Sequence, residues 1–263
     1  MLFRSLKNLV QTLPKKSVDC VIMVDCAQPK RISDGFADFI DAKKGGTLVC
    51  IDHHLLDKPV GNIDWIDPKA ASTGCVIWDL LKKLKLKPTS DAANLIYCTL
   101  TVDTGSFRYS NTTPSVFRLA AELLEEGADP WFVASHLEES NPPNRFVLLK
   151  AALGSLHVGF GGQYASMDVT QKMLQEAKAD ADLSDDFANY PRSIAGVEVS
   201  GLFRELGEGR VKVSLRSKKR VDVSNVAKQF GGGGHKHAAG CVLQCGLEEA
   251  KQEIEKVLQK HLK

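Results

Sequence analysis

The sequence predicts an α/β protein of two domains, and three observations support this fold class. Along the first half of the 263-residue chain, short apolar segments alternate with segments whose apolar residues recur at helical spacing. Such an alternation favours a mostly parallel sheet with helices on its faces. A polar stretch with two adjacent prolines, residues 138–145, interrupts the pattern. Beyond it, two alternating segments flank a Gly-Glu-Gly turn, which indicates an antiparallel hairpin in a smaller second α/β domain.

The composition is that of an ordinary globular protein. Hydrophobic residues make up 43% and charged residues 25%, which excludes the disordered and fibrous classes. No apolar run approaches the ~20 residues of a membrane helix, and residues 1–16 lack the apolar core of a signal peptide. Seven scattered cysteines without a CxxC pair favour a reducing compartment. We therefore expect a soluble, cytoplasmic protein without a membrane partner.

The net charge of +2 lies entirely in the second part of the chain. Residues 1–157 carry 18 basic and 18 acidic side chains, whereas residues 158–263 carry 16 and 14. A near-neutral total argues against a protein that coats long nucleic acid. A local group of cations can still hold a small anion, although a solvated basic turn is the alternative. The basic residues concerned are Arg216, Lys218, Lys219 and Arg220.

The elements of the first domain follow from the apolar pattern. Strands are expected at residues 18–24 and 47–51, with a helix between them at residues 35–44 that a glycine pair ends. A further helix begins near Ser72. Another has Thr113 as its N-cap, with proline as the first helical residue. We expect its buried face to consist of Phe117, Ala120, Ala121 and Leu124.

The polar stretch is the expected domain boundary. We place the first domain at residues 1–140, a linker and connecting helix at residues 141–157, and the second domain at residues 158–263. In the second domain, the hairpin strands are expected around residues 197–203 and 211–215. A short helix ending at Gly231 and a last helix over residues 247–262 complete the chain.

Three aspartates occupy equivalent positions, because each lies at the end of an apolar segment, where a loop begins. Asp25 and Asp52 follow the two strands, and Asp103 follows a helical segment. Ligands of parallel sheets gather beyond the carboxyl ends of the strands, so Asp25 should face the same crevice as Asp52, His53 and His54. Carboxylates and imidazoles together suit Mn²⁺, Fe²⁺ or Zn²⁺ better than Ca²⁺, and the lack of nearby cysteines weakens the case for zinc. For a lone aspartate the alternative is a turn or N-cap residue.

A second candidate site is the glycine-rich segment at residues 231–240. A flexible linker is the alternative interpretation, but a patterned helix and a strand bound this run. Glycines let backbone N–H groups approach a phosphate, and His235 adds a donor. The side chain of Arg216 should point to the face of the hairpin opposite its apolar residues. From there it is expected to reach the same phosphate. His237 should point to the other side of an extended strand, so we leave it out of the site.

These motifs together resemble the DHH/DHHA1 family of phosphoesterases over nearly the whole chain. The matching segments are Val24-Asp25-Cys26, Ile51-Asp52-His53-His54, residues 101–108 (TVDTGSFR), residues 214–217 (SLRS) and residues 231–240 (GGGGHKHAAG). Within the family, the chain is most similar to bacterial bifunctional oligoribonucleases and PAP phosphatases. The resemblance implies a metal-binding DHH domain followed by a substrate-binding DHHA1 domain.

The resemblance also implies roles for individual residues. Asp25 matches the carboxylate that bridges two metals, and His53 and Asp103 match ligands of the second metal. Asp52 would orient the ligands, and His54 would contact the phosphate or assist the leaving group. The residues expected to bind substrate are Arg108, Arg216, Ser217, Gly233, Gly234 and His235.

The implied activity is two-metal hydrolysis, usually with manganese, of short oligoribonucleotides and of 3′-phosphoadenosine 5′-phosphate (PAP) to mononucleotides. The partners are therefore short RNA oligonucleotides and nucleotide phosphates, and a homodimer is left open. Two alternatives also stay open. One is cleavage of cyclic dinucleotides or their linear products, and the other is a non-catalytic nucleotide-binding module.

One departure from the family concerns the first metal. The family's first motif, a His followed by Asp-x-Asp, supplies ligands of that metal, and no such motif precedes Asp25 in this sequence. We expect the chain to begin after the first strand and helix of the family's fold. A start codon placed too late, a fragment and a true loss of one metal site are the three explanations.

Overall fold

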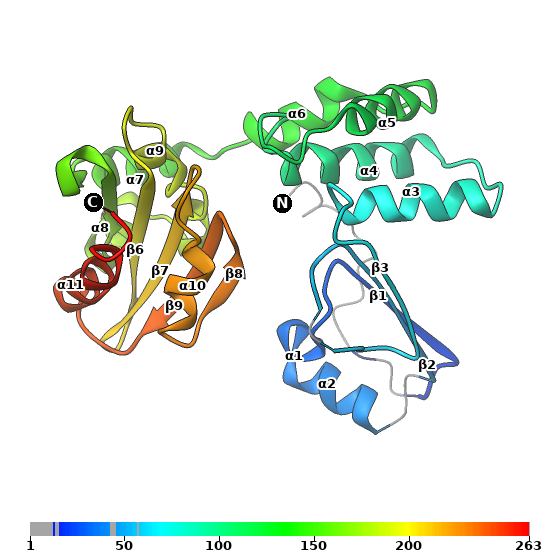
Figure 1. Cartoon of the computed structure of the whole chain (residues 1–263), viewed down its shortest axis with the longest axis horizontal. Coiled ribbons are helices and arrows are strands. Elements are labelled where there is room, and N and C mark those ends of the chain that lie inside the picture. The colour runs from blue at the N-terminus through cyan, green and yellow to red at the C-terminus, as the bar shows by residue number, and fades with distance from the viewer. Residues whose placement is uncertain (1–12, 14–15, 43–45, 57, 263) are drawn as a thin grey trace. The chain divides into compact units, whose positions relative to one another are not determined.

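The computed structural model describes residues 13, 16–42, 46–56 and 58–262. The chain divides into two compact units, Met1–Ser140 and Asn141–Lys263. Each unit has its own sheet and its own helices (Figure 1).

The sheet of the first unit has three parallel strands in the order β1-β2-β3. Two of them, β1 (Cys20–Val24) and β2 (Thr47–Asp52), confirm the strands expected from their apolar runs. The third strand, β3 (Ile63–Ile66), was not predicted, because its four residues are too short for a periodic pattern.

Four helices of the first unit pack on one another (Figure 1), with α4 in contact with α3, α5 and α6. Their core contains Trp78, Leu100 and Leu123. Helix α3 begins after Ser72, and α5 begins with Thr113 as N-cap, both as expected. The helices of this unit are α1 (Pro29–Ile32), α2 (Asp34–Asp41), α3 (Thr73–Lys83), α4 (Ser90–Asp103), α5 (Pro114–Glu125) and α6 (Pro130–Glu138).

The expected buried face of α5 was wrong by one residue. Phe117 is 57% exposed and Leu124 is 45% exposed, whereas Val116, Leu119 and Leu123 are buried. Both sets have helical spacing, so periodicity alone could not choose between them. Phe117 instead stacks on Phe107, at 5.6 Å between ring centroids.

The sheet of the second unit has six strands in the order β4-β5-β6-β7-β9-β8. The β6–β7 pair is the expected hairpin, and β5 pairs with β6 in parallel. The strands are β4 (His157–Gly159), β5 (Tyr164–Val169), β6 (Val199–Gly207), β7 (Arg210–Ser217), β8 (Gly233–His235) and β9 (Ala238–Leu243).

Hydrophobic cores cover both faces of this sheet. On one face, Val213 and Leu215 of β7 pack with residues of α10 and α11. On the other face, Met167 and Leu202 pack with α7, α8 and the segment before α9. The helices are α7 (Pro143–Leu153), α8 (Gln171–Ala177), α9 (Asn189–Arg192), α10 (Val223–Lys228) and α11 (Leu247–Leu258), with short 3₁₀ turns at Phe160–Gly162 and Ala181–Ser184.

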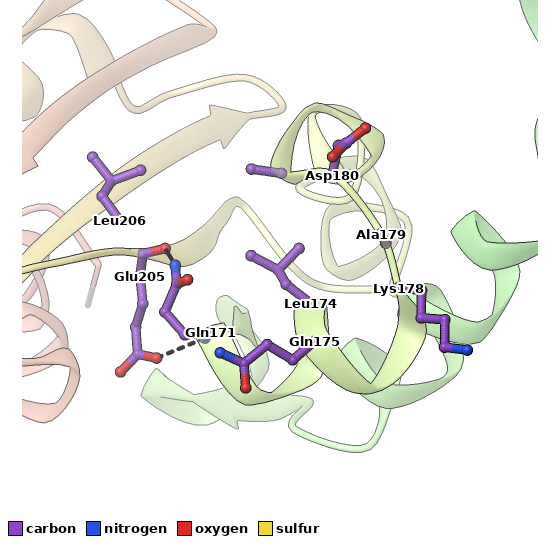
Figure 2. Close-up of a pocket in the computed structure, with 9 residues that line it drawn as sticks. Gln171, Leu174, Gln175, Lys178, Ala179, Asp180, Glu205 and Leu206 are labelled. Atoms are coloured by element: carbon purple, nitrogen blue, oxygen red, sulfur yellow. Dashed lines mark hydrogen bonds between the residues drawn. The ribbon is translucent and has the colours of Figure 1, made fainter.

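A hollow of about 410 Å³ lies beside α8 in the second unit (Figure 2). Gln171 spans one side of it, since its backbone N–H and its side-chain amide both donate to Glu205. None of the residues predicted to form a site lines this hollow. Within the described residues, no helix is long and apolar enough to cross a membrane.

Candidate active site

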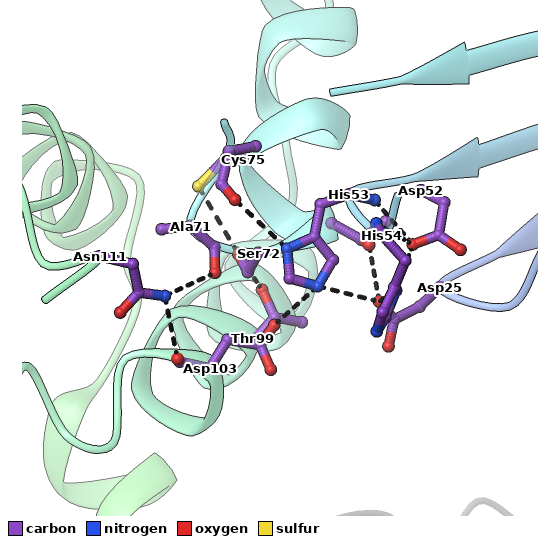
Figure 3. Close-up of polar contacts among 12 residues, drawn as sticks. Asp25, Asp52, His53, His54, Ala71, Ser72, Cys75, Thr99, Asp103 and Asn111 are labelled. Atoms are coloured by element: carbon purple, nitrogen blue, oxygen red, sulfur yellow. Dashed lines mark hydrogen bonds and ion pairs between the residues drawn. The ribbon is translucent and has the colours of Figure 1, made fainter. Parts of the chain in front are cut away.

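Two neighbouring strands of the first sheet end at one edge and bring the candidate ligands together. Val24 lies opposite Ile51 in the parallel pair, so Asp25 and Asp52 both follow the carboxyl ends of their strands. The N–H of Asp25 donates to the Ile51 carbonyl at 3.1 Å. Asp25 itself has left-handed backbone, with φ of 57°, a conformation that aspartate adopts more readily than most residues. Its carboxylate lies beside the two histidines (Figure 3).

Asp52 is fully buried and organises the two histidines that follow it. Its Oδ1 accepts the N–H of His53 at 2.7 Å, the N–H of His54 at 3.0 Å and Nδ1 of His54 at 2.6 Å. Burial alone would raise the pKa of Asp52, but these hydrogen bonds and the charge of His54 lower it below its ordinary value. The hydrogen bonds of Asp52 to His53 and His54 therefore favour its ionised form.

His53 points its Nε2 at two carboxylates. Its Nδ1 lies 3.3 Å from the Ala70 carbonyl, which can only accept a hydrogen bond, so in the neutral ring the lone pair is at Nε2. Nε2 is 3.8 Å from Oδ1 of Asp25 and 3.7 Å from Oδ2 of Asp103. This is the arrangement of a histidine ligand whose second nitrogen is held by a backbone carbonyl.

Asp103 is the last residue of α4, and its carboxylate lies beside Nε2 of His53. Its pKa is raised to about 6, first because it is buried and also because Asp25 carries a like charge, while the charge of His53 opposes the shift. A cation between the two carboxylates would favour their ionised forms. Asn111 holds the backbone here, because its Nδ2 donates to the carbonyls of Asp103 and Ala71.

The donor set fits a divalent cation. Two ligand atoms that each lie about 2.1 Å from one cation are at most about 4.2 Å apart, and the distances from His53 Nε2 to Asp25 and Asp103 fall within that limit. Ligand atoms of Asp25, Asp52, His53 and His54 also lie within 4.8 Å of one another. Oδ2 of Asp52 is buried and has no hydrogen-bond partner among the described residues, as expected for an atom that a bound cation or water satisfies.

Sequence reasoning missed Thr73, the first residue of α3. Its hydroxyl donates to Oδ1 of Asp25 at 2.6 Å, although 48 residues separate the two. The signal available was the position of Thr73 directly after Ser72, the N-cap of a helix that follows the sheet. That signal marks the start of the helix but not the residue that Thr73 contacts.

Arg108 lies five residues after Asp103, on a tight turn at the end of α4. Gly105, Ser106 and Phe107 all have left-handed backbone, with φ of 58°, 58° and 62°. A Cβ on Gly105 would lie 2.3 Å from the Tyr109 ring, so this position requires glycine. Arg108 is exposed, and its Nε donates to the Gly105 carbonyl at 2.6 Å.

In the second unit, two of the predicted residues, Arg216 and His235, lie in one row across three strands. Arg216 of β7 pairs with Ala238 of β9, and Ala238 pairs with His235 of β8. Residues paired in this way share a face of the sheet, and the outer two backbones lie ~10 Å apart. The small side chain of Ala238 lies between Arg216 and His235 in this row.

Two glycines beside this row have different surroundings. A Cβ on Gly233 would meet no atom within 4 Å, so the glycine leaves open space in front of the strand. Gly234 has φ of 140°, and a Cβ there would lie 2.5 Å from the Ala238 carbonyl oxygen. Gly233 therefore leaves open space beside the row, whereas Gly234 shapes the backbone. We call Arg216, Gly233, Gly234, His235 and Ala238 together the cradle.

Ser217 is only 2% exposed, unlike the other residues predicted to bind substrate. Its hydroxyl donates to the Val221 carbonyl at 2.7 Å and lies 2.9 Å from Nδ1 of His237. In this position it supports the loops at the end of the row. The structure thus brings five predicted residues together in the first unit: Asp25, Asp52, His53, His54 and Asp103. Arg108 follows Asp103 closely in the chain. The second unit holds the other group: Arg216, Gly233, Gly234 and His235.

Comparisons with known proteins match both units. Residues 2–100 match the DHH family, N-terminal domain, and residues 148–263 match the DHHA1 domain. The bifunctional oligoribonuclease and PAP phosphatase NrnA of Thermus thermophilus is 35% identical, over 95% of this chain and 72% of that protein. The probable NrnA of Streptococcus mutans is 34% identical, over 84% of this chain and 68% of that protein.

A solved structure agrees with these matches. The exopolyphosphatase-related protein from Bacteroides fragilis superposes with a TM-score of 0.85 and 28% identity, over 93% of this chain and 72% of that one. The fold and the carboxylate–imidazole site define a metal-dependent hydrolase of the phosphoesterase class. The chain belongs to the DHH/DHHA1 family.

Proposed function

We propose that this chain hydrolyses short oligoribonucleotides and PAP to mononucleotides. The observation that carries the proposal is the position of His53 Nε2, less than 4 Å from carboxylate oxygens of both Asp25 and Asp103. The choice of substrates is supported by the similarity to relatives whose names give these two activities.

Manganese is the proposed metal, because carboxylate and imidazole ligands without thiolates suit it. Asp25, His53 and Asp103 would hold one cation. Asp25 would also be a ligand of a second cation. Cations bound there would supply positive charge for the phosphoryl oxygens and lower the pKa of a water ligand. Asp52 keeps both histidines in place through its Oδ1.

His54 is the proposed proton donor to the leaving oxygen. Its Nδ1 lies 2.6 Å from the buried carboxylate of Asp52, and its side chain is 29% exposed. An imidazole paired in this way at Nδ1 holds a second proton at Nε2 in its charged form, and that proton can pass to the leaving group.

The phosphate of the nucleotide would be held by the row in the second unit. Arg216 and His235 lie on one face with Ala238 between them, and Gly233 leaves room for an anion. Arg108, in the first unit, is a further proposed phosphate-binding residue. Guanidinium and imidazolium groups form strong, charge-assisted hydrogen bonds with phosphate oxygens.

An assay with added Mn²⁺ tests this proposal on PAP, a diribonucleotide and a cyclic dinucleotide. We expect turnover of the first two substrates, and we expect His53→Ala to abolish it. His261→Ala is the matched control, because His261 is exposed on the last turn of the chain. Manganese binding, measured by electron paramagnetic resonance, provides a second readout.

The alternatives predict other results. A non-catalytic module would bind PAP without Mn²⁺-dependent turnover. A cyclic-dinucleotide phosphodiesterase would cleave the cyclic substrate in preference to PAP. Full activity in His53→Ala would contradict the proposed metal ligand.

Two further expectations belong to this proposal. A cytoplasmic location agrees with RNA fragments and PAP as substrates, and fractionation of cells tests it. The homodimer left open by the sequence stays an untested prediction, which light scattering of the purified chain decides.

A further inference from the structure

The loop between β3 and α3 carries a backbone carbonyl that contacts a proposed metal ligand. This loop spans residues 67–72, and the carbonyl of Ala70 within it lies 3.3 Å from Nδ1 of His53. The contact leaves Nε2 of the ring turned toward Asp25 and Asp103. The orientation of His53 therefore depends on where the loop holds Ala70.

The loop is anchored at its two ends. The N–H of Asp67 donates to the Asp52 carbonyl at 3.0 Å, and the hydroxyls of Ser72 and Thr99 share a hydrogen bond at 3.0 Å. Between these ends, residues 70–71 line a hollow of about 330 Å³ that α3 and α5 also line. Atoms that border an open space lack packing partners on that side. The middle of the loop thus needs another support.

The side chain of Asn111 attaches the middle of the loop to the end of α4 (Figure 3). Its Nδ2 donates to the Ala71 carbonyl at 3.3 Å and to the Asp103 carbonyl at 3.1 Å. Carbonyl oxygens only accept hydrogen bonds, so the amide must turn its NH2 group toward them and not its oxygen. The two hydrogens of one NH2 group therefore serve two carbonyls.

Both carbonyls lie in the backbone beside a proposed ligand of the same cation. Ala71 directly follows Ala70, whose carbonyl contacts His53, and the other carbonyl belongs to Asp103 itself. His53 and Asp103 come from different elements, since His53 follows β2 and Asp103 ends α4. The hydrogen bonds of Asn111 therefore join the support of one ligand to the backbone of the other.

Consecutive turns bring Asn111 back to the end of α4. The N–H groups of Arg108 and Tyr109 both donate to the Thr104 carbonyl at 2.9 Å, and the N–H of Thr112 donates to the Tyr109 carbonyl at 3.0 Å. Thr104 is fully buried. These backbone hydrogen bonds hold the segment that carries Asn111, so its amide reaches the loop from a defined position.

We propose that Asn111 is a positioning residue that couples His53 and Asp103, two ligands of one cation. It acts through the carbonyls of Ala71 and Asp103. The ion concerned is a divalent cation that binds carboxylate and imidazole groups. This inference rests on the metal site of the proposed function and adds the residue that fixes the spacing of its ligands.

The test measures Mn²⁺ binding to the full chain by electron paramagnetic resonance. Asn111→Ala and Asn111→Leu should each bind Mn²⁺ about tenfold more weakly than wild type, the lower end of the range for residues that orient metal ligands. Leucine keeps the branched shape of asparagine, so it separates loss of hydrogen bonds from loss of packing. In the PAP assay, the Mn²⁺ concentration for half-maximal rate should rise by the same factor, with the rate at saturating Mn²⁺ close to that of wild type.

Asn94→Ala is the matched control. The Asn94 side chain also bonds the backbone within the first unit, because its Oδ1 accepts the N–H of Asp129 at 2.7 Å. Its loss should leave Mn²⁺ affinity unchanged. Asn111 is exposed, so its replacement should cost little unfolding free energy. Urea unfolding without metal checks that each variant is folded.

The other results would overturn the inference. Wild-type Mn²⁺ affinity in both Asn111 variants would show that the ligands need no such support, and the proposed metal site would stand. Weak binding in Asn111→Ala with full affinity in Asn111→Leu would assign the effect to packing. An equal loss in Asn94→Ala would assign it to general destabilisation. Wild-type protein that binds no Mn²⁺ would overturn both this inference and the proposed metal site.

Discussion

The hydroxyl of Thr73 donates a hydrogen bond to Oδ1 of Asp25 at 2.6 Å, which joins the first turn of α3 to the end of β1. The same carboxylate oxygen lies 3.8 Å from Nε2 of His53. Thr73 is 3% exposed, so the contact is largely shielded from water. The orientation of a proposed metal ligand therefore depends on a residue that does not itself face the cation.

Thr73→Val should weaken Mn²⁺ binding while preserving side-chain shape. Loss of a hydrogen bond that orients a ligand typically costs about 10–100-fold in metal affinity. Titration of Mn²⁺ by calorimetry measures the change. Thr47→Val, at the exposed start of β2, is the control. Equal Mn²⁺ affinity in wild type and Thr73→Val would show that Asp25 needs no such support.

Alanine at the two cradle glycines should have opposite effects. Gly233→Ala fills open space, so it should leave the unfolding free energy within about 0.5 kcal/mol and weaken AMP binding. Gly234→Ala should destabilise the fold by about 1–3 kcal/mol, because φ is 140° and the new Cβ would clash with the Ala238 carbonyl. Urea unfolding and calorimetry measure both effects. A loss of stability in Gly233→Ala with AMP affinity unchanged would reverse the assignment.

Glu198→Gln should make the stability of the second unit less dependent on pH. Burial would raise the pKa of Glu198, but hydrogen bonds from the backbone N–H groups of Val221, Arg220 and Lys219 lower it in the folded chain. The ionised form therefore stabilises the fold above the ordinary value of 4.5. That contribution is lost as pH falls through the lower folded-state pKa. We expect Glu198→Gln to cost about 1–2 kcal/mol at pH 7 and almost nothing at the acid end of a urea series. Glu176→Gln, on the exposed side of α8, is the control. A difference that stays constant with pH would be inconsistent with this account.

Much of the metal site could be predicted from the sequence because its residues follow recognisable strands. Asp25, Asp52 and His53 lie at strand ends, and parallel strands bring their carboxyl ends together. Thr73 and Asn111 could not be predicted, because their contacts join residues 48 and 8 positions away that no local pattern connects.

The elements that sequence reasoning missed have a common cause. In β5 (Tyr164–Val169) every residue is buried, including Ser166 and Asp168, so the strand has no alternation of apolar and polar residues. His237 was set aside on the ground that an extended strand would turn it away from His235, which was wrong because residues two apart in a strand share a face. It lies on a turn instead, where Ser217 holds its ring. In both cases tertiary contacts, and not local periodicity, decide the outcome.

The most direct test of the central claim is anomalous diffraction at the manganese edge from crystals of this chain grown with Mn²⁺. If Asp25, His53 and Asp103 hold the cation, a peak will lie about 2.2 Å from Nε2 of His53 and from an oxygen of each carboxylate. Crystals with these three side chains ordered but no manganese bound to them would contradict the claim.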